Sequence, residues 1–254
     1  MSRSRWHCWR VLVVGVWLST VGVPSSYAQG RVAELVQAVK TGDTAAVRRL
    51  LREPANVNLS EADGTTPLHW AVRADREELI RMLLAAGADA GASNRYGVTP
   101  LGLAATNGSE TAIRVLLEAK ADPNTTLAEG ETVLMRAART GSTGAISALL
   151  DAGADVNASE AWLGETALMW AAAENHADAV QLLLDRGARI DARSAPVDFG
   201  ELRYPSTGLV RMVLPRGQWT ALMFAARQGA LDAARVIAKS GADLQARDPD
   251  GVTA

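Results

Sequence analysis

The sequence is poor in the side chains that carry most covalent and metal chemistry. Its 254 residues include one cysteine, Cys8, and three histidines. Cys8 lies in an N-terminal segment that we expect to be removed, so the processed form holds only His69 and His176 and no disulfide bond. No His/Cys spacing typical of a metal site is present.

Motifs of catalysis are missing as well. The sequence has no Gly-rich phosphate loop and no nucleophile elbow. Four aspartates recur at one position of a repeat, which favours a structural role over a catalytic one: Asp89, Asp122, Asp155 and Asp243. We therefore predict that the chain is no enzyme and needs no cofactor or metal.

Positive charge is also scarce. The 26 Lys and Arg residues face 28 Asp and Glu, and lysine occurs only at positions 40, 120 and 239. Without residues 1–28, which hold three arginines and no acid, the balance becomes 26 − 3 = 23 against 28, a net charge of about −5. A uniformly basic face that binds nucleic acid is therefore disfavoured.

The chain has only one long apolar run, in residues 11–23. Three arginines precede it, and the small residues Ser26 and Ala28 follow it, just before Gln29. This order is typical of a secretory signal peptide, and the run is shorter than the roughly 20 residues that a membrane span needs. We expect cleavage before Gln29 and export to the periplasm or the extracellular space; an uncleaved anchor is the alternative.

Internal repetition dominates the rest of the chain. One opening stretch recurs as DGTTPLHWA, YGVTPLGLA, EGETVLMRA, LGETALMWA, GQWTALMFA and a final DGVTA. Its threonine falls at 66, 99, 132, 166, 220 and 253, so the steps are 33, 33, 34, 54 and 33 residues. Because the final stretch opens a sixth unit, we expect this chain to be a fragment.

Each unit predicts two short helices and a turn. In the first unit Thr66 is placed to cap a helix that starts at Pro67. After a break, Leu79, Ile80, Leu83 and Leu84 have the spacing of a second amphipathic helix. Helices this short are marginal alone, so we expect the units to stack into one continuous core.

The TPLH-like box, the paired alanines and turns such as GADVNA resemble ankyrin repeats over about residues 31–254. The resemblance implies an all-α solenoid of helix pairs with projecting β-hairpin fingers, which binds proteins and lacks catalytic activity. In this family the box histidine, here His69, bonds the capping threonine. Lys120 stands where a glycine is expected, and Arg189 where an aspartate is usual.

The period divides the chain into units. Residues 1–28 are the signal peptide and 29–62 an atypical capping repeat. Full repeats follow over 63–95, 96–128, 129–162, 163–216 and 217–249, with a partial one at 250–254. The fourth carries an insertion at about 194–216, which we expect either to fold back on the stack or to serve as a docking arm.

Binding residues are expected where the repeats differ. Aromatic and arginine side chains are enriched in binding hot spots. The predicted protein-binding residues are Arg73, Tyr96, Asn107, Arg136, Arg139, Trp162, Glu174, Trp219 and Arg227, with Leu209 and Met212 in the insertion. Arg73, Arg139 and Arg227 share one repeat position, so we expect stacking to place them in a row. Such a row of arginines predicts a partner with an acidic strip.

The sequence thus predicts a monomeric protein-binding scaffold of the cell envelope. The alternative is a recognition arm of a longer enzyme or sensor, whose catalytic domain would lie beyond residue 254. The predicted partner is a protein, and we expect neither nucleic acid nor, after cleavage, a membrane span.

Overall fold

The computed structural model describes residues 25–52, 57–127, 130–196 and 217–254. Within these ranges the chain forms twelve α-helices and no extended strand. The predicted all-α solenoid is confirmed. The helices are α1 Ser25–Thr41, α2 Thr44–Leu50, α3 Pro67–Arg73, α4 Glu77–Ala85, α5 Pro100–Asn107, α6 Glu110–Glu118, α7 Val133–Thr140, α8 Thr143–Asp151, α9 Ala167–Ala173, α10 Ala177–Asp185, α11 Ala221–Gln228 and α12 Leu231–Lys239.

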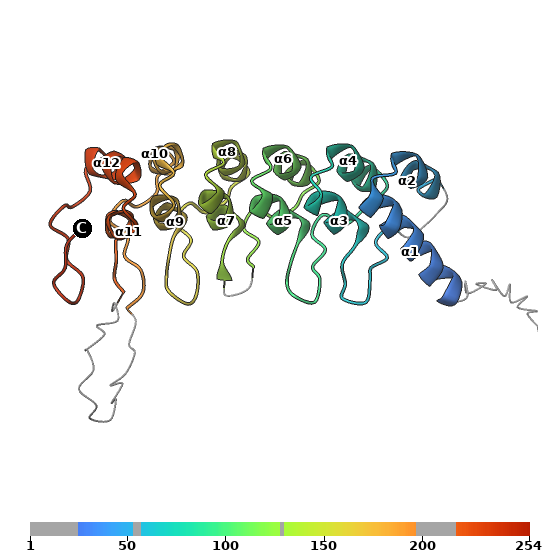
Figure 1. The fold of residues 1–254 in the computed structure, drawn as a ribbon, viewed down its shortest axis with the longest axis horizontal. Helices are drawn as coiled ribbons and strands as arrows, with labels where there is room; N and C mark the ends of the chain where they lie inside the picture. The colour runs from blue at the N-terminus through green and yellow to red at the C-terminus, as the bar shows by residue number, and fades with distance from the viewer. Residues whose placement is uncertain (1–24, 53–56, 128–129, 197–216) are drawn as a thin grey trace, which may run out of the picture.

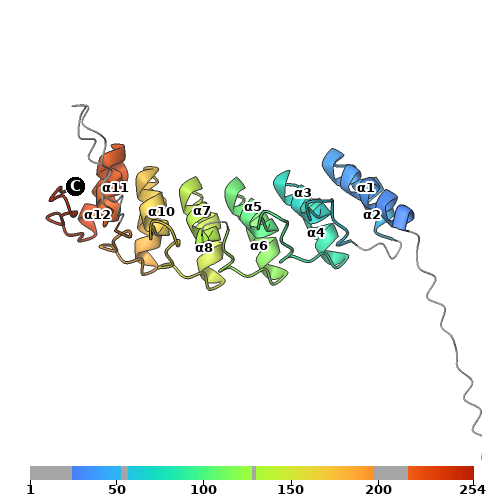
Figure 2. The same ribbon diagram turned by 90° about the horizontal axis from the view of Figure 1, so that it is seen from below.

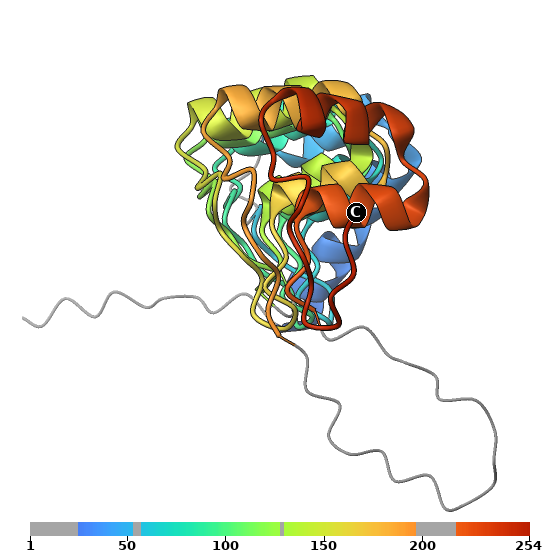
Figure 3. The ribbon, with the colours of Figure 1, turned by 90° about the vertical axis from the view of Figure 1, so that its left-hand side faces the viewer.

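The helices stand in two rows. Odd-numbered helices form an inner row and even-numbered helices an outer row, with the hairpin fingers projecting on one side (Figure 1). Seen from below, the stack bows gently (Figure 2), and the view from the C-terminal end shows the fingers in register (Figure 3). Each odd helix packs on the next odd helix, and each even helix on the next even one. Every unit is therefore covered by its neighbours.

The inner helices start at the repeated threonine. Thr66 and Thr132 accept a hydrogen bond from the backbone N–H three residues on, which satisfies one of the free donors of the first turn. Thr99, Thr166 and Thr220 make the same bond. The predicted cap is thus present in all five boxes.

His69 has the role that the resemblance implied. Its Nδ1 lies 2.7 Å from Thr66 Oγ1 and accepts the Thr66 N–H, while Nε2 lies 3.0 Å from the Val98 carbonyl. These partners assign the ring hydrogen to Nε2, and burial lowers the pKa of His69. The neutral ring therefore ties the first repeat to the finger of the second.

The core follows the predicted stripes. Leu68 and Ala71 of α3 are buried, as are Leu79, Ile80 and Leu83 of α4. Full burial of a Leu or Ile side chain contributes about 1.5–3 kcal/mol. The stack thus supplies the burial that a lone helix pair lacks.

The paired alanines of the inner helices are not all buried. Ala104 and Ala105 of α5 are both buried under the next helix, but Ala226 of α11 is exposed while Ala225 is buried. Among the described residues no further inner helix packs on α11 as α7 packs on α5, and Ala226 lines the last cleft of the stack.

A side-chain ladder joins the turns that follow the outer helices. Asn124 donates to the Gly153 carbonyl at 3.1 Å and accepts the Asp155 N–H at 2.9 Å. Asn58 and Asn157 repeat both bonds with the turns after their own. At the same position Asp191 accepts the Asp243 N–H, whereas Gly91 has no side chain to offer.

The row of aspartates serves these turns. Asp89, Asp122, Asp155 and Asp243 each accept the backbone N–H two residues on, at 2.9 Å. This is the local bond by which Asp favours turns, and it confirms the structural role predicted for the row.

Two departures from the repeat pattern are accommodated by the backbone. Lys120, at the glycine position of its turn, has a left-handed φ of 68°, and Arg189 still donates its N–H to Asn157. A non-glycine residue in that region carries a steric cost.

The gap in the ladder at Gly91 predicts a stabilising substitution. Gly91→Asn should add the bonds to Lys120 and Asp122, which contribute about 0.5–1.5 kcal/mol each. A Cβ on Gly91 would meet only Asp89 Oδ1 at 3.5 Å, an ordinary contact, and φ is not left-handed there. Urea unfolding should show a higher midpoint.

Gly91→Ala is the matched control, because it shares the loss of backbone freedom without the amide. If the Asn and Ala variants unfold at the same urea concentration, the ladder bonds contribute nothing at this junction.

Candidate functional site

Nine of the predicted binding residues lie in the described part of the chain. The other two, Leu209 and Met212, lie outside it, as do residues 197–216, which make up most of the insertion. The two expectations for the insertion, a segment folded back on the stack or a docking arm, therefore stay predictions.

The base of the insertion lies within the described residues. Pro196 pairs with Gly217 in an isolated antiparallel bridge, which brings the two ends of the insertion together. Helices α9 and α11 on either side of it pack directly on each other. The insertion therefore leaves the stacking of the inner row intact.

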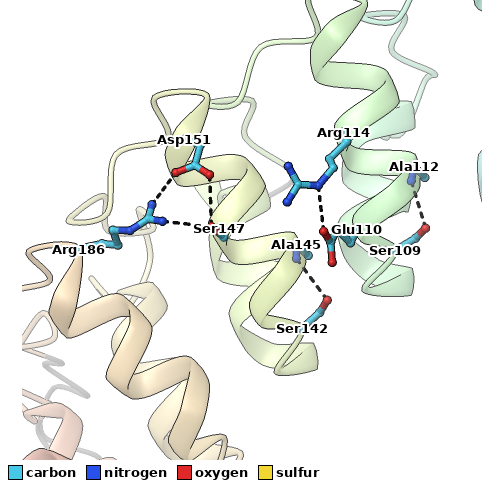
Figure 4. A network of polar contacts seen from close by, with 9 residues as sticks. All are labelled: Ser109, Glu110, Ala112, Arg114, Ser142, Ala145, Ser147, Asp151 and Arg186. Carbon is cyan, nitrogen blue, oxygen red and sulfur yellow. Dashed lines mark hydrogen bonds and ion pairs between the residues drawn. The ribbon is translucent and has the colours of Figure 1, made fainter.

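On the outer face of the stack, charged and polar side chains of the even-numbered helices pair with one another. Arg186 donates to Asp151 at 2.8 Å and to Ser147 at 3.1 Å, which joins α10 to α8 (Figure 4). Arg114 pairs with Glu110 along α6. These exposed pairs contribute little stability. The predicted binding residues belong to the inner helices and the fingers.

Two exposed aromatic side chains stand on the fingers. Tyr96 and Trp162 are each 71% exposed. The Asn94 side chain accepts the N–H groups of Tyr96 and Val98, both at 3.0 Å. In Trp162's finger the buried Glu160 carboxylate accepts three backbone N–H groups, including that of Trp162 at 2.6 Å. Both aromatic residues are therefore carried on hairpins whose backbone is fixed.

Three clefts on the inner side each contain an indole and a guanidinium group. The first cleft, of about 310 Å³, is lined by Trp70, Arg73 and Tyr96 among others. The middle cleft, of about 230 Å³, is lined by Arg139, Glu165, Trp170, Glu174, Phe224 and Gln228. The last cleft, of about 520 Å³, is lined by Trp219, Met223, Arg227, Asp248, Asp250 and Val252.

Each arginine of the predicted row lies over an indole ring. Arg73 Cζ is 5.4 Å from the ring centroid of Trp70, and Arg139 Cζ is 5.5 Å from that of Trp170. Arg227 Cζ is 4.6 Å from that of Trp219, which also meets Phe224 edge to face. Such stacking is favourable and orients the guanidinium group.

The arginines of the inner helices differ in whether a carboxylate of the chain pairs with them. Arg139 forms an ion pair with Glu174 at 3.5 Å, and Arg136 forms one with the buried Glu131. Arg73 and Arg227 form no ion pair with any described residue. All three arginines of the row therefore lie in clefts on the inner side, but the positive charge along the row is not uniform, because Arg139 is paired with a carboxylate.

Asn107 has partners within the chain. Its amide donates to the carbonyls of Val72 at 3.0 Å and Arg73 at 3.4 Å, at the C-terminal end of α3. A helix end leaves such carbonyls without intrahelical partners. Asn107 thus links the first two repeats, and its predicted role in binding stays a prediction.

Trp70, Trp170 and Phe224 share one repeat position and are half buried. The sequence reasoning missed the partners of Trp70: its Nε1 donates to Glu61 at 2.6 Å, and Lys40 Nζ lies 3.9 Å from the ring centroid. The contact between the Arg73 guanidinium and the Trp70 ring could have been predicted, because the two residues lie three apart on one helix.

Metal and membrane sites find no support in the described residues. No group of three or more His, Cys, Asp or Glu side chains there is placed to hold a metal ion. Among the same residues, no helix is long and apolar enough to cross a membrane.

Comparison with known proteins agrees with the architecture. A family model for ankyrin repeats (3 copies) matches residues 35–127 and 120–194, and a single ankyrin repeat matches residues 217–249. The chain belongs to the ankyrin-repeat family. Ankyrin-repeat proteins are typically non-catalytic modules that bind other proteins. A search of curated proteins finds no match.

Two solved ankyrin-repeat structures are similar over most of the chain. The human ASB11 ankyrin repeat domain is 26% identical, with a TM-score of 0.69, and the match covers 86% of this chain and 88% of that one. The ankyrin repeat domain of Bcl-3, described as a unique member of the IkappaB protein family, is 29% identical with a TM-score of 0.66. That match covers 87% of this chain and 91% of the other.

The Glu165 carboxylate in the middle cleft should make the stability of the fold depend on pH. Burial raises the pKa of Glu165, and the neighbouring Glu160 carboxylate raises it further. A raised folded-state pKa means that stability falls as pH rises through it, because the folded chain holds the proton more tightly. Glu165→Gln should therefore raise the melting temperature at about pH 7, with no gain below the ordinary Glu pKa of about 4.3.

Thermal melts across that pH range test this. Glu118→Gln, which removes a carboxylate that is 69% exposed, is the control and should change the melting temperature little at any pH. A Glu165→Gln gain that is the same at both ends of the range would contradict the role of burial.

Proposed function

We propose that this chain is a non-catalytic protein-binding scaffold of the cell envelope, and that its partner docks on the fingers and inner helices. The observation that carries the proposal is the exposure of Tyr96 and Trp162, because neither ring is needed to pack the stack. Large exposed aromatic side chains are enriched at binding sites.

The fixed finger backbone supports the same proposal. Neighbouring fingers are joined by main-chain bonds, from Arg95 N–H to the Asp63 carbonyl at 2.8 Å and from Ala195 N–H to the Leu163 carbonyl at 2.6 Å. A binding surface that is ordered before the partner arrives loses less conformational entropy on binding. The fingers thus suit a protein surface that is recognised without rearrangement.

Capture from envelope extract tests the proposal. The full chain serves as bait, and the double variant Tyr96→Ser, Trp162→Ser should lose the captured protein, since hot-spot aromatic residues contribute about 2 kcal/mol or more. Its melting temperature should stay close to that of the unchanged chain.

Leu231→Ser provides the matched control. Leu231 is 64% exposed but lies at the start of outer helix α12. Capture that survives the finger variant and fails with Leu231→Ser would place the binding surface on the outer row and refute the proposal.

The envelope location rests on the N-terminal segment. We propose that residues 1–28 direct export and are removed, because the arginines, the apolar run and the small residues Ser26 and Ala28 occur in the order of a signal peptide. Helix α1 begins at Ser25. Cleavage before Gln29 would leave most of this helix in the first unit.

N-terminal sequencing of the chain expressed in a bacterial host should read from Gln29. Ala28→Glu, which puts a large charged side chain at the cleavage position, should leave the precursor uncut. Unprocessed Met1 on membrane-bound protein would show that the segment is an anchor instead.

A further inference from the structure

The three clefts differ in how the chain balances its own arginine. In the middle cleft Glu174 pairs with Arg139 and a second carboxylate, Glu165, lines the wall. In the last cleft Asp248 and Asp250 line the same space as Arg227. Two carboxylates therefore line each of these clefts beside one arginine. Of the two arginines, only Arg139 is ion-paired with a described residue, because Asp248 accepts the Trp219 indole N–H at 3.2 Å and the backbone N–H groups of Asp250 and Val252.

The first cleft is different. Only one carboxylate, Asp63, is among its lining residues. Asp63 accepts the Thr65 N–H at 2.9 Å, and this bond, with the nearby Arg95, lowers the pKa of Asp63. Glu61, beside the cleft, pairs with Lys40 at 2.9 Å and accepts the Trp70 indole N–H. Arg73 therefore forms no ion pair with a described residue, and its cleft is lined by one carboxylate where each of the other two clefts is lined by two.

The surroundings of Arg73 are also ordered in advance. The bond from Trp70 Nε1 to Glu61 and the contact with Lys40 hold the indole ring on which the Arg73 guanidinium lies. Tyr96 lines the same cleft from the finger of the second repeat. A guanidinium group that lies over one aromatic ring, in a cleft that a second ring lines, matches a carboxylate that sits beside an apolar side chain.

We propose that the first cleft is the subsite that receives an acidic residue of a protein partner. The carboxylate binds Arg73, and an apolar or aromatic neighbour in the partner's chain packs against Trp70 and Tyr96. The volume of about 310 Å³ is at the lower end of the range for small-ligand sites and suits one or two side chains. This proposal rests on the proposed function, and it assigns acid recognition to Arg73 in place of the whole row.

Peptide binding by the full chain tests the subsite. The probes are short fluorescent peptides that carry one Asp or Glu beside one Leu or Phe, each with a twin in which the acid is Asn or Gln. Fluorescence polarisation should show that acidic members bind more tightly than their twins. Arg73→Gln should weaken that binding by about ten- to hundredfold, the effect of losing a charged hydrogen bond, and reduce its salt dependence.

Arg139→Gln and Arg227→Gln are matched controls, because both residues share the repeat position of Arg73 and lie over an indole. Each should change the affinity by less than about twofold, as expected for charges away from the contact. The melting temperature of all three variants should be nearly unchanged, which separates lost binding from lost folding.

Three results would overturn the proposal. Equal losses in all three variants would show that the row acts as a whole, and twins that bind as well as acidic peptides, or a panel that does not bind, would show that the cleft does not read acids. If the unchanged chain still captures an envelope protein, the proposed function stands without this subsite; if capture also fails, both are wrong.

Discussion

Packing between neighbouring repeats is the interaction on which this structure depends. A helix pair of seven to nine residues per helix buries too little surface to be stable alone. Each inner helix is therefore held by the inner helices before and after it, and each outer helix in the same way. This dependence explains why the repeated residues are buried or bonded and why variation falls on exposed positions or on turns whose backbone accommodates it.

The same constraint decides where extra chain can be accommodated. The 54-residue step between Thr166 and Thr220 leaves α9 packed on α11, because the added residues leave and return through one finger. Ser194 and Trp219 exchange backbone and side-chain hydrogen bonds at 3.0 Å beside the Pro196 bridge. An insertion within a helix would instead shift every apolar residue that follows it off the packed face.

The repeated positions could be predicted from sequence, but the charge pairing could not. Thr66, Leu68 and the aspartates of the turns recur, so their roles follow from the period and from local bonding. Arg139 meets Glu174, which lies 35 residues away in the next repeat, and the contact depends on how two inner helices sit side by side. Asn107 looked like a free polar side chain for the same reason: its partners, Val72 and Arg73, belong to another unit. The asymmetry between the three clefts comes from these contacts across repeats.

The gap in the turn ladder at Gly91 has a mechanical consequence. It falls between the first and second repeats, which also hold the first cleft between them. That junction is fastened at the finger by His69 and at the C-terminal end of α3 by Asn107, while the turn after the outer helix lacks both asparagine bonds. A junction that lacks these bonds at one edge is expected to bend there more easily than junctions that have them. Bending there would change the curvature of the stack and the width of the first cleft together, so a ligand that spans both repeats would also set the shape of the whole solenoid.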